Sequence, residues 1–91
     1  MINPAARINY KHLRYFYEIV REGSVAGAAR RLHVTPQTVS SQVRSLERAL
    51  GRPLFERLGR KLTLTADGEV AVDYAESIFA LGAELRDVMS R

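Results

Sequence analysis

Polar side chains that can donate and accept hydrogen bonds gather on one segment, residues 36–50. The apolar residues of this segment recur as on one face of a helix, which leaves the other positions to polar groups. Serine and threonine are mediocre helix formers, so a helix that exposes them is expected to use them for recognition. The residues expected on the exposed side are Gln37, Thr38, Ser40, Ser41, Arg44 and Arg48.

Charge is distributed unevenly along the 91 residues. Residues 1–61 hold twelve Lys/Arg and four Asp/Glu, a formal charge of +8, whereas residues 62–91 hold two and six, a formal charge of −4. A polyanion is the natural partner for the basic part. A solvated basic surface without a partner would have the same composition, so charge leaves both readings open.

The sequence offers little for catalysis, metal binding or membrane insertion. It has no cysteine, which excludes disulfides and thiolate metal sites and fits a reducing cytoplasm. Its two histidines, His12 and His33, accompany no paired carboxylates and no phosphate-cradling glycine loop, so no catalytic residue, metal or cofactor is expected. Glu47 is interpreted as a charge partner of Arg44 or Arg48. No stretch approaches the roughly 20 apolar residues of a membrane span, and the first ten residues lack a signal-peptide run, which predicts a cytoplasmic chain.

Three helices are predicted to position the polar groups. The first runs from Asn9 to Glu22, the second is capped by Ser24 and reaches Leu32, and the third is capped by Thr35 and runs to about residue 50. Pro36 suits the first position of the third helix, and glycines close the first and third helices. The residues expected to face inward are Leu13, Phe16, Ile19, Val20, Val25, Ala28, Ala29, Leu32, Val39, Val43, Leu46 and Leu50.

A β-hairpin is predicted between residues 53 and 65. Residues 54–55 and 62–64 are strand-like, and residues 58–61 are interpreted as the hairpin tip. A two-stranded ribbon is marginally stable alone, so it must pack on the helices. The candidate anchors are Leu54, Phe55, Leu62 and Leu64.

The last helix is expected to open at Thr65 with Asp67 and Gly68, and to reach Ser90. It carries two apolar faces, and a 91-residue chain has too little protein to cover both. One face, with Ala71, Ala75 and Phe79, is expected to pack on the preceding helices. The other is expected to pair with a second copy of the chain, although burial of this helix within its own domain is the alternative. The predicted pairing residues are Val70, Tyr74, Ile78, Leu81, Leu85 and Val88.

Together these features predict that residues 24–46 form a helix-turn-helix that binds double-stranded DNA. An α-helix fits the major groove, and its first residues reach the base edges while flanking groups contact phosphates. The candidates for base contact are Gln37, Thr38, Ser41 and Arg44, and those for phosphate contact are Ser24, Thr35, Ser40 and Arg48. Arg60 and Lys61 at the hairpin tip suit the adjacent minor groove. Nonspecific nucleic-acid binding and a pure dimerisation module are the alternatives, which would leave the polar helix or the basic surface unexplained.

A pattern across residues 9–91 resembles the N-terminal domain of LysR-type transcriptional regulators. The residues that carry the resemblance are Leu13, Phe16, Gly23, Ser24, Ala28, Ala29, Leu32, Val39, Ser40, Gln42, Val43, Arg44, Leu46, Glu47, Leu50, Gly51, Leu54, Phe55, Arg57, Arg60, Leu64, Thr65 and Gly68. Within the family, residues 8–13, 22–29 and 34–38 are most similar to the subgroup that activates sodium/proton antiporter genes.

The resemblance implies a mainly helical fold: a tail at residues 1–8, a winged helix-turn-helix of three helices and a two-stranded wing at residues 9–65, and a linker helix at residues 66–91 that pairs antiparallel in a homodimer. It also implies an effector domain outside this chain, so neither effector binding nor tetramer formation is expected of the fragment. The implied function is regulation of transcription from a partly palindromic site, expected as activation, with the choice between activation and repression left open by the sequence.

By position, the resemblance assigns DNA contacts on the third helix to Thr35, Pro36, Gln37, Ser40 and Ser41. It also assigns minor-groove insertion to Arg60, capping of the linker helix near a phosphate to Thr65, and bracing of the wing to Arg57.

Two departures from the family pattern bear on base recognition. Many members read Ser-Gln-Pro where this chain has Thr35-Pro36-Gln37, which moves the glutamine by one position, about 100° around the helix. Many members have arginine in place of Ser41, and a serine cannot form the bidentate contact of an arginine with guanine. More of the base recognition is therefore expected from Gln37, Thr38 or Arg44.

Overall fold

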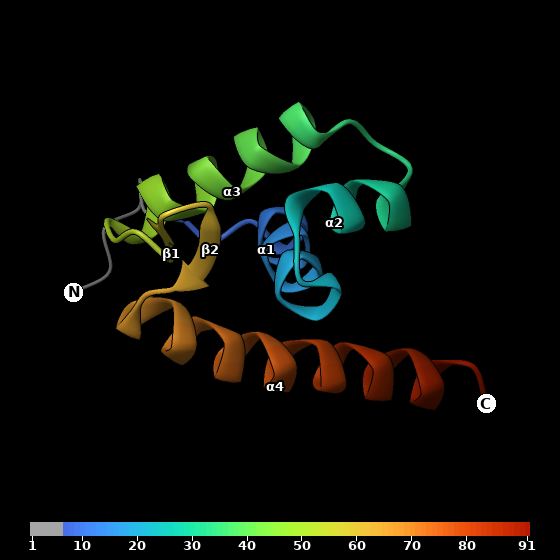
Figure 1. The fold of residues 1–91 in the computed structure, drawn as a ribbon. Coiled ribbons are helices and arrows are strands. Elements are labelled where there is room, and N and C mark those ends of the chain that lie inside the picture. The colour runs from blue at the N-terminus through green and yellow to red at the C-terminus, as the bar shows by residue number, and fades with distance from the viewer. Residues whose placement is uncertain (1–6) are drawn as a thin grey trace.

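Four helices and a two-stranded sheet make up residues 7–91, the part of the chain that the computed structural model describes (Figure 1). In chain order the elements are α1 (Tyr10–Glu22), α2 (Val25–Leu32), α3 (Pro36–Leu50), β1 (Phe55–Leu58), β2 (Lys61–Leu64) and α4 (Ala66–Met89). This confirms the predicted winged helix-turn-helix fold with a long last helix. Most of the tail predicted at residues 1–8 falls outside the described residues.

The helices begin and end at the predicted residues because the capping groups are encoded locally. Each N-cap side chain accepts a hydrogen bond from a backbone N–H of the first turn, and these caps are Asn9, Ser24, Thr35 and Thr65. Gly23 and Gly51 end α1 and α3 in the left-handed conformation, with φ of 83° and 71°. His33 takes that conformation at the end of α2 with φ of 58°, and its N–H is bonded to the carbonyls of α2.

The core lies where α1, α2 and α3 cross, and β1, β2 and α4 cover its remaining sides. Phe16, Val39 and Leu46 are completely buried. Ala28 and Ala29 on α2 are buried as well, and their small side chains let the three helices approach closely. The prediction that Leu50 faces inward is wrong: this residue is exposed, because the last turn of α3 extends past the core.

The two strands pair antiparallel, with Phe55 opposite Leu64 and Leu58 opposite Lys61. The turn therefore has only two residues, Gly59 and Arg60, and the expected tip of four residues is corrected: Leu58 and Lys61 are the last pair of the ladder. Glycine suits the first turn position because φ there is 67°.

All four predicted hairpin anchors contact the helical core. Leu54 is 1% exposed, and the Phe55 ring lies 5.3 Å, between centroids, from the ring of Phe16. Leu62 and Leu64 are half-buried against the same core. The wing therefore leans on the helices, as a two-stranded ribbon must.

α4 lies on the opposite side of α1 from α3 (Figure 1). It packs on α1 through Ala75, which is fully buried, and through Phe79, whose ring lies 5.0 Å from that of Tyr10 and 5.4 Å from that of Tyr17. Although α4 has 24 residues, no helix within residues 7–91 is long and apolar enough to cross a membrane.

The other apolar face of α4 is uncovered. Val70, Tyr74, Leu81, Leu85 and Val88 are each between 49% and 68% exposed, and Ile78 is half-buried at the edge of the core. The alternative prediction, in which α4 is buried entirely within its own domain, is therefore wrong.

Gly68 is the tightest contact between α4 and the wing. It is buried, and a side chain there would overlap the carbonyl oxygen of Leu54 and press on Leu64. The Gly68→Ala substitution is therefore expected to lower the free energy of unfolding by about 1–3 kcal/mol, the range typical of overpacking.

Gly82→Ala in the same helix is the matched control for Gly68→Ala. Its added Cβ meets only the hydroxyl end of Tyr10, which can turn aside, and alanine favours a helix by about 1 kcal/mol over glycine. Urea unfolding followed by circular dichroism compares the two variants. Equal midpoints for Gly68→Ala and the unsubstituted chain would contradict this account of the contact.

Candidate nucleic-acid interface

The exposed side of α3 carries a row of polar side chains. Gln37, Ser41, Arg44 and Arg48 are all exposed, at spacings of four, three and four residues that keep them on one face of the helix. Val39, Val43 and Leu46 fill the opposite face and bury it in the core. Since α4 lies on the far side of the molecule, nothing covers this row in the described chain (Figure 1).

Hydroxyl groups at the ends of the helices are partly engaged by the fold. Thr35 Oγ1 accepts the N–H of Thr38 at 3.1 Å and lies 2.9 Å from Thr38 Oγ1, so the two threonines form one unit at the start of α3. Ser24 Oγ accepts the N–H of Gly27 at 2.9 Å. Because that bond uses only a lone pair, the Ser24 hydroxyl keeps its proton for an external acceptor.

Thr65 lies at the junction of the wing and α4, apart from α3. Its hydroxyl accepts the N–H of Gly68 at 2.9 Å and donates to the carbonyl of Pro53 at 2.8 Å. The capping role that the resemblance implies is confirmed. Because the Thr65 hydroxyl donates its proton to the carbonyl of Pro53, this side chain links the base of the wing to the start of α4.

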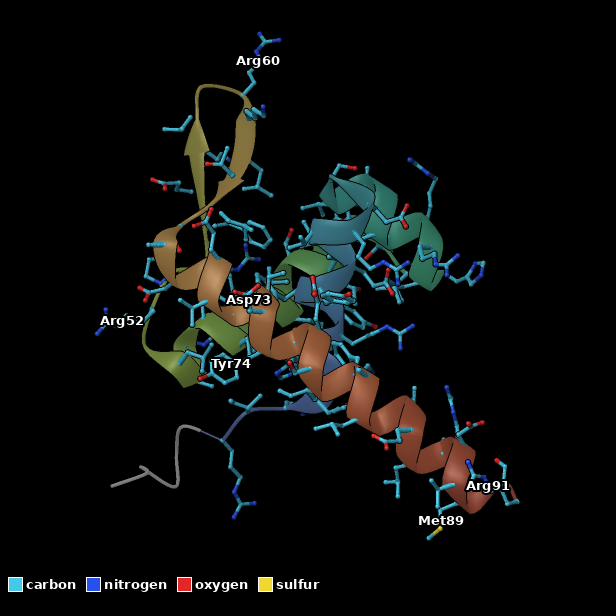
Figure 2. All side chains as sticks on the ribbon, turned by 90° about the horizontal axis from the view of Figure 1, so that it is seen from below. Arg52, Arg60, Asp73, Tyr74, Met89 and Arg91 are labelled. Atoms are coloured by element: carbon cyan, nitrogen blue, oxygen red, sulfur yellow. The ribbon has the colours of Figure 1, made fainter. Side chains whose placement is uncertain are left out.

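The wing carries its positive charge at the tip. Arg60 lies at the far end of the hairpin (Figure 2), and the adjacent Lys61 is exposed too. Within residues 7–91, neither of these two cations, nor Arg44 or Arg48 on α3, forms an ion pair with an acidic side chain. All four charges are therefore available to a polyanion.

A shallow hollow separates α3 from the wing. Ser40 is half-buried there beside Arg44, Phe55 and Leu62, and Arg57 lines the hollow from the wing. Ser40 therefore lies at the edge of the exposed polar face of α3, which we call the recognition face, rather than at its centre.

Glu47 links α3, the predicted recognition helix, to the wing. Its Oε2 accepts the N–H of Leu54 at 2.7 Å and that of Phe55 at 3.4 Å. The interpretation of Glu47 as a charge partner of Arg44 or Arg48 is therefore wrong. After α3 ends, the chain reverses through residues 51–53 and brings two backbone N–H groups to the carboxylate. The sequence indicates this structural role of Glu47 only weakly, in that Glu47 is the single acidic residue between positions 23 and 55.

Removing the carboxylate with Glu47→Ala is expected to lower the free energy of unfolding by about 1–3 kcal/mol, because the N–H of the buried Leu54 loses its acceptor. Glu47→Gln keeps one acceptor oxygen and should recover most of this loss. Thermal unfolding of the two variants side by side measures the difference. If alanine and glutamine are equally stable, the hydrogen bonds to the wing contribute nothing.

Within residues 7–91, no three His, Cys, Asp or Glu side chains come close enough together to hold a metal ion. What the geometry presents instead is a polar helix face supported by a three-helix core, next to an antiparallel hairpin with a basic tip. These features define a winged helix-turn-helix, a class of fold that places one helix in a DNA groove.

Comparison with known proteins places the chain more narrowly. Residues 10–69 match the family of bacterial regulatory helix-turn-helix proteins, lysR family, and the chain belongs to this family. It is 45% identical over 85 residues to the transcriptional activator protein NhaR of Escherichia coli (strain K12), and 37% identical over 84 residues to the regulator ClcR of Pseudomonas putida. The alignments cover 93% and 92% of this chain, which spans 28% of the length of each of these relatives.

Solved structures of the family superpose closely on this fold. The BenM DNA-binding domain in complex with catB site 1 DNA matches with a TM-score of 0.86 and 31% identity, over 92% of this chain and 90% of that one. The CbnR DNA-binding domain in its DNA complex matches with a TM-score of 0.83 and 34% identity, over 91% and 95%. The predicted LysR-type DNA-binding domain is thereby confirmed.

Proposed function

We propose that this chain binds double-stranded DNA sequence-specifically, as a homodimer on a partly palindromic site, and thereby regulates transcription in the cytoplasm. The observation that carries the proposal is the row of exposed polar side chains on one face of α3, whose two arginines form no ion pair within the described residues. An activating role is supported by the relative named a transcriptional activator, at 45% identity. The narrower subgroup, activators of sodium/proton antiporter genes, stays a prediction. The proposal involves no catalysis and no cofactor.

Base recognition is assigned to residues 37–44 of α3. The Gln37 amide can form two hydrogen bonds with adenine, and the Arg44 guanidinium can form two with guanine. Ser41 lies between them on the same face and can reach either kind of base edge. Thr38 is tied to Thr35 by a hydrogen bond, so it acts by orienting the start of the helix beside Pro36.

Phosphate contacts are assigned to groups at the borders of this face. The Ser24 hydroxyl retains a proton to donate, and the exposed Arg48 is a free charge on the same face of α3 as Gln37. Thr35 and Ser40 are the remaining predicted phosphate ligands. The wing cations Arg60 and Lys61 fit an adjacent minor groove, whose negative potential attracts arginine.

Gln37→Ala is expected to remove the preference for one base pair, at a cost of about 1–3 kcal/mol on the preferred duplex, because the amide is the group that distinguishes the base. The control is Arg48→Gln, which should weaken binding to all duplexes equally because a phosphate contact carries no sequence information. Selection of bound duplexes from a random pool measures the base preference, and fluorescence anisotropy titration of the selected duplex measures the affinity. Wild-type binding without preference among duplexes at physiological salt would reject sequence-specific binding.

The dimer is assigned to the uncovered face of α4. Its apolar residues are spaced almost symmetrically about the midpoint between residues 79 and 80. In an antiparallel pair Val70 therefore meets Val88 of the second copy, and Tyr74 meets Leu85. This arrangement also sets Asp73 level with an arginine, Arg86.

Leu81→Asp is expected to convert the dimer to a monomer, because it places a charge next to the centre of the pairing face. Ala80→Asp is the matched control, since Ala80 is exposed on the same helix but lies off that face. Sedimentation velocity at several protein concentrations measures the oligomeric state. If Leu81→Asp sediments as a dimer like the control, pairing through this face is disproved.

A further inference from the structure

A second basic surface flanks α3 on the side away from the wing. It is an open hollow of about 460 Å³ between the start of α1 and the second half of α3. Its polar lining comes from two segments far apart in sequence: Arg7, Asn9 and His12 from the first, and Ser45 and Arg48 from the second. Arg7, Asn9, His12 and Ser45 are not among the residues predicted to contact DNA.

The chemistry of this hollow suits an anion. Two arginines and a histidine line it, and among residues 7–91 no acidic side chain does. The Arg48 guanidinium donates to Ser45 Oγ at 3.0 Å, which holds its charge against the wall of the hollow. The side-chain oxygen of Asn9, Oδ1, accepts the N–H groups of Lys11 and His12, so the side-chain N–H₂ of Asn9 remains free to donate.

The position of the hollow relates it to the recognition face. Arg48 belongs to both, because it lines the hollow and stands in the exposed row of α3. Figure 2 shows the wing tip and the chain leading into α1 on opposite sides of the molecule. The recognition helix is therefore flanked by a basic hairpin on one side and by the basic hollow on the other.

We propose that this hollow binds a phosphate group of the DNA backbone, with Arg7 and His12 as its ligands beside Arg48. This inference rests on the proposed function, since it requires α3 to enter a major groove. That groove is about 12 Å wide and has a sugar-phosphate strand along each edge. With the wing beyond one edge, the hollow meets the strand at the other. The contact extends the DNA footprint past the helix-turn-helix and the wing.

Arg7→Gln tests the proposal, and Arg91→Gln is the control. Both remove one positive charge from an exposed arginine, and Arg91 lies at the far end of α4 (Figure 2). Arg7 precedes the first helix, so its substitution leaves the fold intact. Affinity for the selected duplex and for an unrelated duplex of equal length is measured by fluorescence anisotropy over a series of salt concentrations.

Arg7→Gln is expected to weaken binding to both duplexes by the same factor, several-fold at 0.1 M salt. It should also reduce the slope of log K against log salt by about 0.9, the value for one phosphate contact. His12→Gln should weaken both duplexes in the same way, which a role confined to Arg7 would not produce. If Arg7→Gln and Arg91→Gln give the same affinity and slope, the hollow holds no phosphate.

The two proposals fail in different ways in this experiment. The ratio of the unsubstituted chain's affinities for the two duplexes reports sequence-specific binding. The difference between Arg7→Gln and Arg91→Gln reports the hollow, and it can be read on the unrelated duplex alone. If the two duplexes bind with equal affinity but Arg7→Gln still weakens binding, only sequence-specific binding is rejected. If the selected duplex binds much more tightly but Arg7→Gln has no effect, only the phosphate site in the hollow is rejected.

Discussion

Burial of Val39, Val43 and Leu46 holds α3 in a single rotation about its axis. Consecutive residues of a helix differ by about 100°, so a shift of one position would bury a recognition side chain and expose an apolar one. The exposed row from Gln37 to Arg48 is thus a consequence of what the inner face packs against. The close crossing at Ala28 and Ala29 keeps α3 near α1 and α2, and larger side chains there would lift the recognition helix away from its support.

The wing depends on the same core through two kinds of contact. Leu54 and Phe55 supply apolar burial, with Phe55 against Phe16, and Glu47 supplies hydrogen bonds from α3 itself. The second contact matters for geometry because it fixes the start of β1 relative to the recognition helix. The position of Arg60 at the wing tip therefore depends on Glu47, an acidic residue in the middle of a basic segment.

The sequence predicts those parts of the fold that local chemistry determines. Helix ends at Asn9, Ser24, Thr35 and Thr65 followed from capping residues, and the uncovered face of α4 followed from its spacing. The exposed recognition residues followed from the periodicity of the apolar ones.

Features that depend on how the chain folds back could not be predicted in this way. The role of Glu47 requires knowledge of where the backbone of residues 54–55 passes, and the hollow requires that residue 7 approach residue 48. Leu50 fits the inward periodicity of α3 and is nevertheless exposed, because periodicity does not say where a core ends. The occupied hydroxyl of Thr65 likewise depends on a carbonyl twelve residues away, at Pro53.

The absence of a side chain at Gly68 also has a mechanical consequence. The first turn of α4 rests directly on the backbone of Leu54, with no flexible side chain between them to absorb a displacement. Close-packed contacts of this kind transmit strain rather than dissipate it. A force that tilts α4 therefore also tilts the base of the wing, and the hairpin tip, being farthest from this pivot, travels the greatest distance.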